Sequence, residues 1–281
     1  MKGKLFNIIL VLMLLAGLAL MLYPIVSDYY NSYLQSRIIV DYANQVNQME
    51  EALHREQLEA ARIYNESLAE NRSQTPLSDE QWEIYNAMLS TTDEGIMAYV
   101  EIPSISVTLP IAHGTSEQTL QRYVGHLEWS SLPIGGENTH CVISGHRGLP
   151  SAELFTNIDH LAVGDRFSIH VLGDKLDYIV DNIAVVEPYD YSLLTIQDGK
   201  DYVTLVTCTP YGINSHRLLV RGTRVEGAQT PELNLTINNE TSDVDLMVLI
   251  PLVLAVLVVI VFAVLLIDSS KRKGKGGKHE K

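Results

Sequence analysis

The sequence predicts a mainly β fold, a barrel or a sandwich, preceded by a helical extension and placed between two membrane-spanning helices. After Ile96 the chain consists of short β-branched and aromatic runs separated by Gly, Pro, Asp and Asn, the pattern of many short strands joined by turns. Between residues 27 and about 70, apolar residues recur at helical spacing among Gln, Glu and Arg. Two runs near the ends of the chain are almost wholly apolar. These three observations define the predicted fold class.

The apolar runs are each long enough to cross a bilayer. Leu5 to Val26 and Leu246 to Ile267 comprise 22 residues each, and a hydrocarbon core of about 30 Å needs about 20 residues at ~1.5 Å per residue. Lys2 and Lys4 precede the first run, and the second is followed by basic residues: Lys271, Arg272, Lys273, Lys275, Lys278 and Lys281. Because positively charged flanks stay in the cytoplasm, we expect both termini to be cytoplasmic and the segment between the runs to be extracellular.

The first run has an alternative interpretation as a cleaved signal peptide. Its basic start fits that interpretation. However, residues 22–26 (LYPIV) contain no small-residue cleavage site, and the apolar stretch is long for a signal peptide. We therefore expect a retained anchor at the cell membrane, with cleavage as the alternative.

The segment between the two runs is strongly acidic. It holds 32 of the 34 acidic residues but only 12 of the 20 basic ones, since the other eight basic residues flank the apolar runs, so its net charge is near −20. Bulk charge therefore argues against nucleic acid and anionic lipid surfaces as partners. The sequence contains no CxxC, no HExxH, no clustered acidic loop and no phosphate-binding glycine loop, so we expect neither a metal nor a cofactor.

These features divide the chain into six segments. We expect an N-terminal anchor or signal at 1–26, a helical extension at 27–93, a β domain at 94–226, a polar linker at 227–245, a membrane-spanning helix at 246–267 and a basic tail at 268–281. In the extension, Ser78 and Gln81 have the spacing of a capping box that opens a helix through about Leu89. In the β domain the strand-like runs are 97–102, 107–111, 141–144, 166–172, 176–186, 202–207 and 218–225, and brief helices are expected at 115–122 and 151–155.

Cys208 is the first candidate for chemistry. It ends the strand-like run that begins at Tyr202, and the Thr-Pro-Tyr-Gly sequence that follows breaks the strand. Arg217 lies nine residues further on, beside a second apolar run that Arg221 closes. A thiol at the end of a strand with a guanidinium across a turn has the parts of a nucleophile and an anion stabiliser. The alternative is a buried structural cysteine beside a surface arginine.

His146 is the histidine best placed to serve that thiol. It follows the strand-like run His140 to Ser144, at a position where a general acid or base is held by a rigid element yet remains exposed. If this strand lies beside the cysteine strand and runs the same way, His146 and Cys208 meet at one rim. Cys141 then lies about 16 Å from that rim at ~3.3 Å per residue, too far for a disulfide, which needs Cα atoms within roughly 7 Å. We therefore expect Cys141 to be a buried free thiol.

Longer stretches of the chain resemble a known family. TLVTCTPYGINSHRLLVRG (Thr204 to Gly222) resembles the signature of the class C, pilus-assembling sortases of Gram-positive bacteria. The similarity continues upstream through AYVEIPSISVTLPI, AHGTSEQTLQRYVGHLEWSSLPIGGENTH and VISGHRGLPSAELF, and covers roughly Gly95 to Val225. The resemblance implies an eight-stranded sortase β-barrel. The two anchors and the acidic, helical extension resemble that class too.

The resemblance also implies an activity. The family's catalytic cysteine, histidine and arginine match Cys208, His146 in SGHRG and Arg217 in SHRLL. The Cys208 thiolate would attack the Thr–Gly amide of an LPxTG-like sorting signal, while Arg217 stabilises the oxyanion and His146 protonates the leaving amine. A lysine amine of the next pilin subunit would resolve the thioester as an isopeptide bond. The implied partners are pilins or surface proteins with such signals, and the membrane.

One departure from the family concerns access to the cysteine. Many class C enzymes cover it with a lid that carries an Asp-Pro-aromatic motif just before the barrel. Here the nearest match is Thr75-Pro76-Leu77, which lacks both the acid and the aromatic, and Asp79 and Trp82 follow at a different spacing. We therefore expect a lid near Pro76 that is weakly held, a lid built from other residues, or no lid.

Two alternative functions are consistent with parts of the sequence. A sortase that attaches surface proteins to the cell wall would use the same three residues. A scaffold that organises pilins without catalysis would need none of them, so the joint presence of Cys208, His146 and Arg217 argues against it. The TPYG sequence after the cysteine and the C-terminal apolar run favour pilus assembly.

Overall fold

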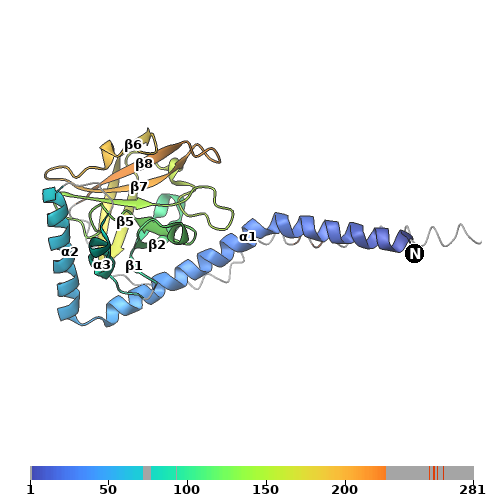
Figure 1. Ribbon diagram of the computed structural model, residues 1–281, viewed down its shortest axis with the longest axis horizontal. Helices are drawn as coiled ribbons and strands as arrows, with labels where there is room; N and C mark the ends of the chain where they lie inside the picture. Colours follow the sequence, from blue (N-terminus) through green and yellow to red (C-terminus); the bar gives the residue numbers. More distant parts are fainter. Residues whose placement is uncertain are drawn as a thin grey trace, which may run out of the picture. The chain divides into compact units, whose positions relative to one another are not determined.

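The computed structural model describes residues 2–71, 77–92 and 94–225, together with the four separate residues Val253, Val256, Val258 and Phe262 (Figure 1). Residues 30–233 form one compact unit, and the first 29 residues belong to another. The predicted linker at 227–245, the basic tail at 268–281 and all but four residues of the second span at 246–267 lie outside the described residues, as do Thr75 and Pro76.

A closed barrel of eight strands forms the centre of the compact unit. In barrel order the strands are β1-β2-β3-β4-β7-β8-β6-β5, and two neighbouring pairs, β2–β3 and β4–β7, are parallel while the others are antiparallel. The bounds are β1 Ile96–Ile102, β2 Val107–His113, β3 Val124–His126, β4 Thr139–Ser144, β5 Arg166–Val171, β6 Asp174–Val186, β7 Asp201–Thr209 and β8 His216–Arg224. This architecture confirms the mainly β fold and decides between the barrel and the sandwich.

Alternation along the strands divides the barrel into an inner and an outer face. In β7, Val203 and Leu205 belong to the large buried cluster that also contains Phe167. Val206 instead packs in a smaller cluster with Val142, Leu194 and Leu219. Because side chains two residues apart in a strand share a face, Cys208 lies on the same outer face as Val206.

Three helices of the extension precede the barrel: α1 Lys2–Gln48, α2 Glu51–Asn71 and α3 Asp79–Ala87. The single helix predicted from residue 27 to about 70 is wrong in one respect, since it breaks between α1 and α2. The predicted capping box is confirmed, with the Gln81 amide donating to Ser78 Oγ and the Ser78 amide donating to Gln81 Oε1. In Figure 1, α2 and α3 lie alongside the barrel.

The end of α1 is joined to the barrel wall through Tyr42. The Tyr42 hydroxyl donates to the carbonyl of Met97 at 3.0 Å and accepts from the amide of Leu172 at 2.8 Å. Continued by two residues past the Tyr99–His170 pair, the β1–β5 register brings Met97 opposite Leu172. The tyrosine therefore continues the hydrogen-bond ladder where β1 and β5 separate, so this part of the extension does not act as a free stalk.

The sequence patterns miss one strand of the β domain and predict one helix that the structure does not contain. The short strand β3 was not predicted, because Val124-Gly125-His126 is too brief and too glycine-rich for a strand pattern. The helix expected at 151–155 is wrong: those residues form turns and a bridge between Leu149 and Ala152. The brief helix expected at 115–122 is confirmed as α4, Glu117–Leu120, which Ser116 caps.

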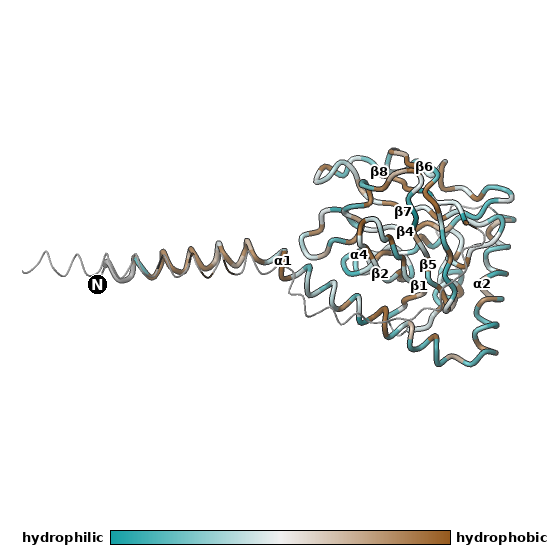
Figure 2. The backbone as a smooth tube through the Cα atoms, turned by 180° about the vertical axis from the view of Figure 1, so that it is seen from behind, coloured by the Kyte–Doolittle hydropathy of each residue, from teal (hydrophilic) through white to brown (hydrophobic). Residues whose placement is uncertain are grey.

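The described part of α1 contains the first apolar run. Among the described residues, one helical segment, Phe6–Gln48, is long and apolar enough to cross a membrane by length and composition. Figure 2 shows the N-terminal part of α1 in the colour of hydrophobic residues, giving way to a mixed pattern further along. This agrees with an N-terminal membrane anchor.

Two histidines are buried in the barrel as neutral imidazoles. Burial lowers the pKa of His126 and of His140 to about 4 in each case. His126 Nε2 donates to the Ser131 carbonyl at 2.9 Å, and its Nδ1 accepts from the hydroxyl of Tyr85. His140 Nδ1 donates to the Thr195 carbonyl, and its Nε2 accepts from Thr204 at 2.7 Å. Each ring is satisfied only in its neutral form.

We predict that stability falls as the pH drops from about 6.5 towards 4. The unfolded chain takes up protons at His126 and His140 in this range while the folded chain does not, so each histidine removes about 2 kcal/mol of unfolding free energy at pH 5. Asp201, whose pKa is raised by burial, acts in the opposite direction. Urea unfolding at pH 7 and pH 5 of a soluble fragment from Tyr30 tests this.

His140→Gln should reduce that pH dependence, whereas the same change at the exposed His160 should leave it intact. Equal unfolding free energies at both pH values would contradict the prediction.

Candidate active site

The parallel pairing of β4 with β7 brings His146 level with Cys208. Ser144 is paired with Val206, so two residues further along both strands the histidine comes beside the cysteine. Two bonds extend the pairing beyond the end of β4: the Gly145 amide donates to the Val206 carbonyl at 3.0 Å, and Thr207 Oγ1 donates to the Gly145 carbonyl at 2.7 Å. The two strands are therefore parallel neighbours, as the expected meeting of His146 and Cys208 requires.

The antiparallel pairing of β7 with β8 places Arg217 directly opposite Cys208. The turn between these strands is closed by amides of Ile213 and Asn214, which donate to the Pro210 carbonyl. Cys208 is partly exposed. Cysteine, histidine and arginine thus come from the ends of three neighbouring strands to one rim of the barrel.

Arg217 and Arg221, two of the three arginines of β8, differ in their partners. Arg217 Nη1 donates to the carbonyls of Asn214 at 3.3 Å and His216 at 3.1 Å, and Arg217 forms no ion pair with any residue that the structure describes. Arg221 is held by two bonds to the carboxylate of Asp181, at 3.0 and 2.9 Å, and lies 4.2 Å from the ring centre of Tyr202. Of Arg217 and Arg221, it is Arg217 whose guanidinium is free of a carboxylate partner among the described residues and keeps donors for a bound anion.

The surroundings of His146 leave one of its ring nitrogens without a partner. Nε2 is shielded from solvent and has no hydrogen-bond partner among the described residues, and Oε2 of Glu117 lies 3.9 Å away. Gly145 must be glycine, because a Cβ there would lie 2.8 Å from the ring of Phe155 and 2.9 Å from Val124. The phenyl ring thus packs against the backbone that carries the histidine. Glu117 was not singled out in the sequence, since only the fold brings α4 to this rim.

A buried apolar cluster lies on the outer face of the barrel, next to the rim that carries Cys208. It is formed by Val142, Val206 and Leu219 of the strands and by Leu194 of the β6–β7 connection, with Trp129 packed against it. Trp129 also contacts Tyr191 of that connection edge-on, with ring centres 5.5 Å apart.

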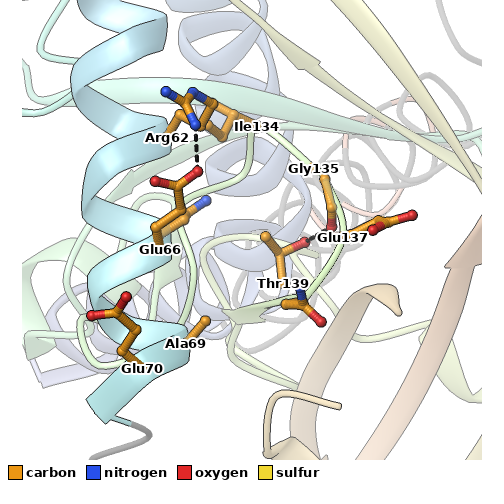
Figure 3. Close-up of a pocket in the computed structure, with 11 residues that line it drawn as sticks. Arg62, Glu66, Ala69, Glu70, Ile134, Gly135, Glu137 and Thr139 are labelled. Atoms are coloured by element: carbon orange, nitrogen blue, oxygen red, sulfur yellow. Dashed lines mark hydrogen bonds and ion pairs between the residues drawn. The ribbon is translucent and has the colours of Figure 1, made fainter. Parts of the chain in front are cut away.

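The cavity between α2 and residues 134–139 lies at the opposite end of the strands (Figure 3). Its volume is about 500 Å³. Thr139 and Asp201, which begin β4 and β7, are paired at that end, seven residues or about 23 Å along the strand from Cys208. Figure 3 shows Arg62 in an ion pair with Glu66, and Glu70 on the same helix. The cavity is separate from the rim that carries Cys208, His146 and Arg217.

Cys141 is a free thiol, as predicted. Its side chain is 3% exposed and it is paired with Val203 on the inner face of the barrel. Burial raises the pKa of this thiol far above that of a free cysteine. Only Cys208 of the two is placed to act as a nucleophile.

The described lid candidates are held by α3 and its surroundings. Leu77 packs partly buried against the main core cluster, and Asp79 lies in the first turn of α3. The Trp82 ring centre is 5.2 Å from that of Tyr85, and a Cβ on Gly114 would lie 2.9 Å from the indole. None of these contacts involves Cys208, His146 or Arg217.

Arg147 is a residue of the site that sequence reasoning did not identify. It directly follows His146 and its Nη1 donates to Thr209 Oγ1 at 3.1 Å, beside Cys208 in the chain. Its position in SGHRG was visible, but its partners lie 62 and 12 residues away and only the fold reveals them. Among the described residues, no group of three or more His, Cys, Asp and Glu side chains is arranged to hold a metal ion.

Comparison with known proteins agrees with the fold. Residues 100–225 match the family model of the sortase domain. Sortase C1 of Streptococcus agalactiae is 46% identical with a TM-score of 0.66, and the match covers 68% of this chain and 99% of that chain. Sortase C of Streptococcus pneumoniae is also 46% identical with a TM-score of 0.61, over 68% of this chain and 97% of that chain.

Sortase D of Bacillus subtilis is 33% identical over 129 residues, which covers 45% of this chain and 62% of that relative. The barrel, the family match and these neighbours define a protein of the cysteine transpeptidase class. The chain belongs to the sortase family, within its class C.

We predict that the two thiols react at very different rates. Iodoacetamide should modify Cys208 in the folded protein, because it lies partly exposed at the rim, and should modify Cys141 only after unfolding, because it is buried in the barrel. Mass spectrometry of peptides labelled with and without urea measures this. The Cys208→Ala variant, which should take up no label when folded, is the control. Comparable native labelling of both cysteines would contradict the prediction.

Proposed function

We propose that this protein is a membrane-anchored transpeptidase that joins pilin subunits through isopeptide bonds. The observation that carries the proposal is the meeting of Cys208, His146 and Arg217 at one rim through two strand registers. The similar sortase C of Streptococcus pneumoniae is described in terms of pilin substrate specificity, which supports a pilin substrate here.

In the first step Cys208 is the nucleophile and His146 the general acid. The thiolate attacks the carbonyl carbon of the Thr–Gly bond in an LPxTG-like sorting signal, and the carbonyl oxygen becomes an oxyanion. Arg217, which has no competing carboxylate among the described residues, donates to that oxygen. The C–N bond then breaks as His146 gives its proton to the glycine nitrogen. The product is a thioester between threonine and Cys208.

In the second step a lysine amine of another subunit resolves the thioester. The neutral amine attacks the thioester carbonyl, His146 accepts the proton that the amine loses, and the thiolate leaves. One amide replaces another, so no ATP is needed provided that water is kept from the thioester. The acceptor lysine belongs to the partner protein.

The proposed localisation is the cell membrane with the catalytic domain outside. The N-terminal apolar helix supports one anchor, and the basic flanks of both apolar runs favour cytoplasmic termini. Attachment of surface proteins to the cell wall is the alternative function, in which an amine of the cell wall replaces the pilin lysine.

The proposed lid is the segment around Pro76. Leu77 and Trp82 fix its C-terminal end against the core and Tyr85. In Asp79 and Trp82 the chain has an acid and an aromatic, but α3 holds both residues. We therefore propose a lid that closes weakly over Cys208.

We predict that Arg217 and Arg221 of β8 contribute unequally to turnover. Arg217→Lys should lower kcat about 10²- to 10³-fold, because one ammonium does not replace a guanidinium fork at the oxyanion. Arg221→Lys, on the same strand, should lower kcat less than about fivefold, because Arg221 is already bound to Asp181. Peptide cleavage by each variant measures this, and equal losses would refute the assignment of Arg217.

Product formation tests the function itself. The extracellular fragment from Tyr30, mixed with a sorting-signal peptide and candidate pilins, should give an isopeptide-linked product that Cys208→Ala and His146→Gln abolish. Product that survives Cys208→Ala would refute the mechanism. Transfer to a cell-wall amine with no transfer to pilin lysines would favour the alternative function.

Replacing residues 75–77 by three glycines tests the lid. A weakly held lid leaves Cys208 accessible part of the time, so its loss should speed alkylation of Cys208 by two- to tenfold. The exchange of the exposed residues Asp198 and Lys200 for glycine, at the end of the β6–β7 connection where residue 199 is already glycine, is the control. An unchanged rate would show that these residues do not cover the cysteine.

A further inference from the structure

Arg147 links the loop that carries His146 to the turn that follows Cys208. Nη1 donates to Thr209 Oγ1 at 3.1 Å, and Nη2 donates to the carboxylate of Asp159. The Arg147 side chain is only 10% exposed. One guanidinium thus bridges the two chain segments that must stay together for a thiol and an imidazole to cooperate.

A second contact joins the same two segments. The ring of Tyr211 lies against Gly148, where a Cβ would come within 2.8 Å of it, and the Arg147 guanidinium is 5.9 Å from the ring centre. Gly148 has a φ of +73°, and its amide donates to Thr156 Oγ1 at 3.0 Å. The loop after His146 is therefore held from both sides, by the Cys208 turn and by residues 156–159.

A buried arginine with an unpaired donor lowers the stability of the fold unless its other bonds offset the cost of desolvation. The Nε atom of Arg147 is shielded from solvent and has no acceptor among the described residues, which carries a desolvation penalty. A fixed fork can hold two partners in different directions, whereas a lysine ammonium cannot reproduce that geometry. The arrangement suits a clamp.

We propose that Arg147 is a positioning residue that holds His146 in register with Cys208 by clamping the His146 loop to Thr209 and to Asp159. It does not touch the substrate and transfers no proton. Its effect is to keep the imidazole within reach of the thiol and the leaving amine during turnover, because a displacement of about 1 Å in such a pair costs on the order of 10²-fold in rate. The inference rests on the proposed roles of Cys208 and His146.

A double-mutant cycle between Arg147 and Thr209 tests the clamp on the full-length chain in detergent micelles. Arg147→Gln removes the fork, and Thr209→Val removes the acceptor at constant size. We expect kcat for sorting-peptide cleavage to fall about tenfold or more in each single variant, with KM within about twofold. The double variant should be no slower than Arg147→Gln, because both changes break one interaction. Arg147→Lys should recover less than half of the lost rate.

Arg166→Gln, at an exposed position at the start of β5, is the matched control for loss of one positive charge and should keep kcat unchanged. Thermal unfolding of every variant separates positioning from folding. Losses in kcat that multiply in the double variant, or that merely follow the fraction unfolded at the assay temperature, would overturn the proposal.

A readout without substrate distinguishes failure of the clamp from failure of the proposed function. The rate of Cys208 alkylation is measured against pH in the wild type, in Arg147→Gln and in His146→Gln. The Arg147→Gln profile should lie between the other two, because the imidazole is present but displaced. A profile identical to that of the wild type overturns the clamp whether or not any pilin is joined.

Discussion

The register between β4 and β7 is the constraint that brings His146 level with Cys208 at one rim of the barrel. A shift of one residue would turn every side chain of one strand to the opposite face, and Cys208 would then point into the barrel. Several bonds oppose such a shift. His140 accepts from Thr204 across the two strands, and Thr207 donates to the carbonyl of Gly145 just beyond the end of β4. Polar groups on the strands thus fix the alignment that hydrophobic packing alone would leave less certain.

The alternation of side chains between the two faces of each strand gives the two cysteines different surroundings. Cys141 and Val203 face each other on the inner side, among the apolar residues that stabilise the barrel. Cys208 follows Val206 on the outer side, next to the buried apolar cluster of β4, β7 and β8. The chain therefore keeps a partly exposed thiol and a buried one on the same sheet as free cysteines, because they lie on opposite faces of the barrel wall.

Much of this architecture is encoded locally and can be predicted from the sequence. Seven of the eight strands, the capping box at Ser78 and the buried Cys141 follow from residue pattern and spacing. The expectation that His146 and Cys208 meet needed one assumption, that their strands are parallel neighbours. What could not be predicted depends on contacts between distant residues: β3 is held by its neighbours and not by its own sequence, and residues 151–155 form turns around a bridge at Leu149. Arg147 and Glu117 likewise could not be identified from the sequence, because the fold alone brings Arg147 to Thr209 and Asp159 and brings Glu117 near His146.

The hydroxyl of Tyr42 makes the helical extension part of the barrel's hydrogen bonding, which the sequence of the extension alone does not indicate. Because it lies between Met97 and Leu172, it bridges two opposed backbone groups where β1 and β5 separate. The extension therefore completes the hydrogen bonding of the barrel wall at that seam. A recombination event that moved the barrel onto another anchor would leave two backbone groups unpaired at that seam, so evolution can vary the membrane end of this protein more freely than the junction near Tyr42.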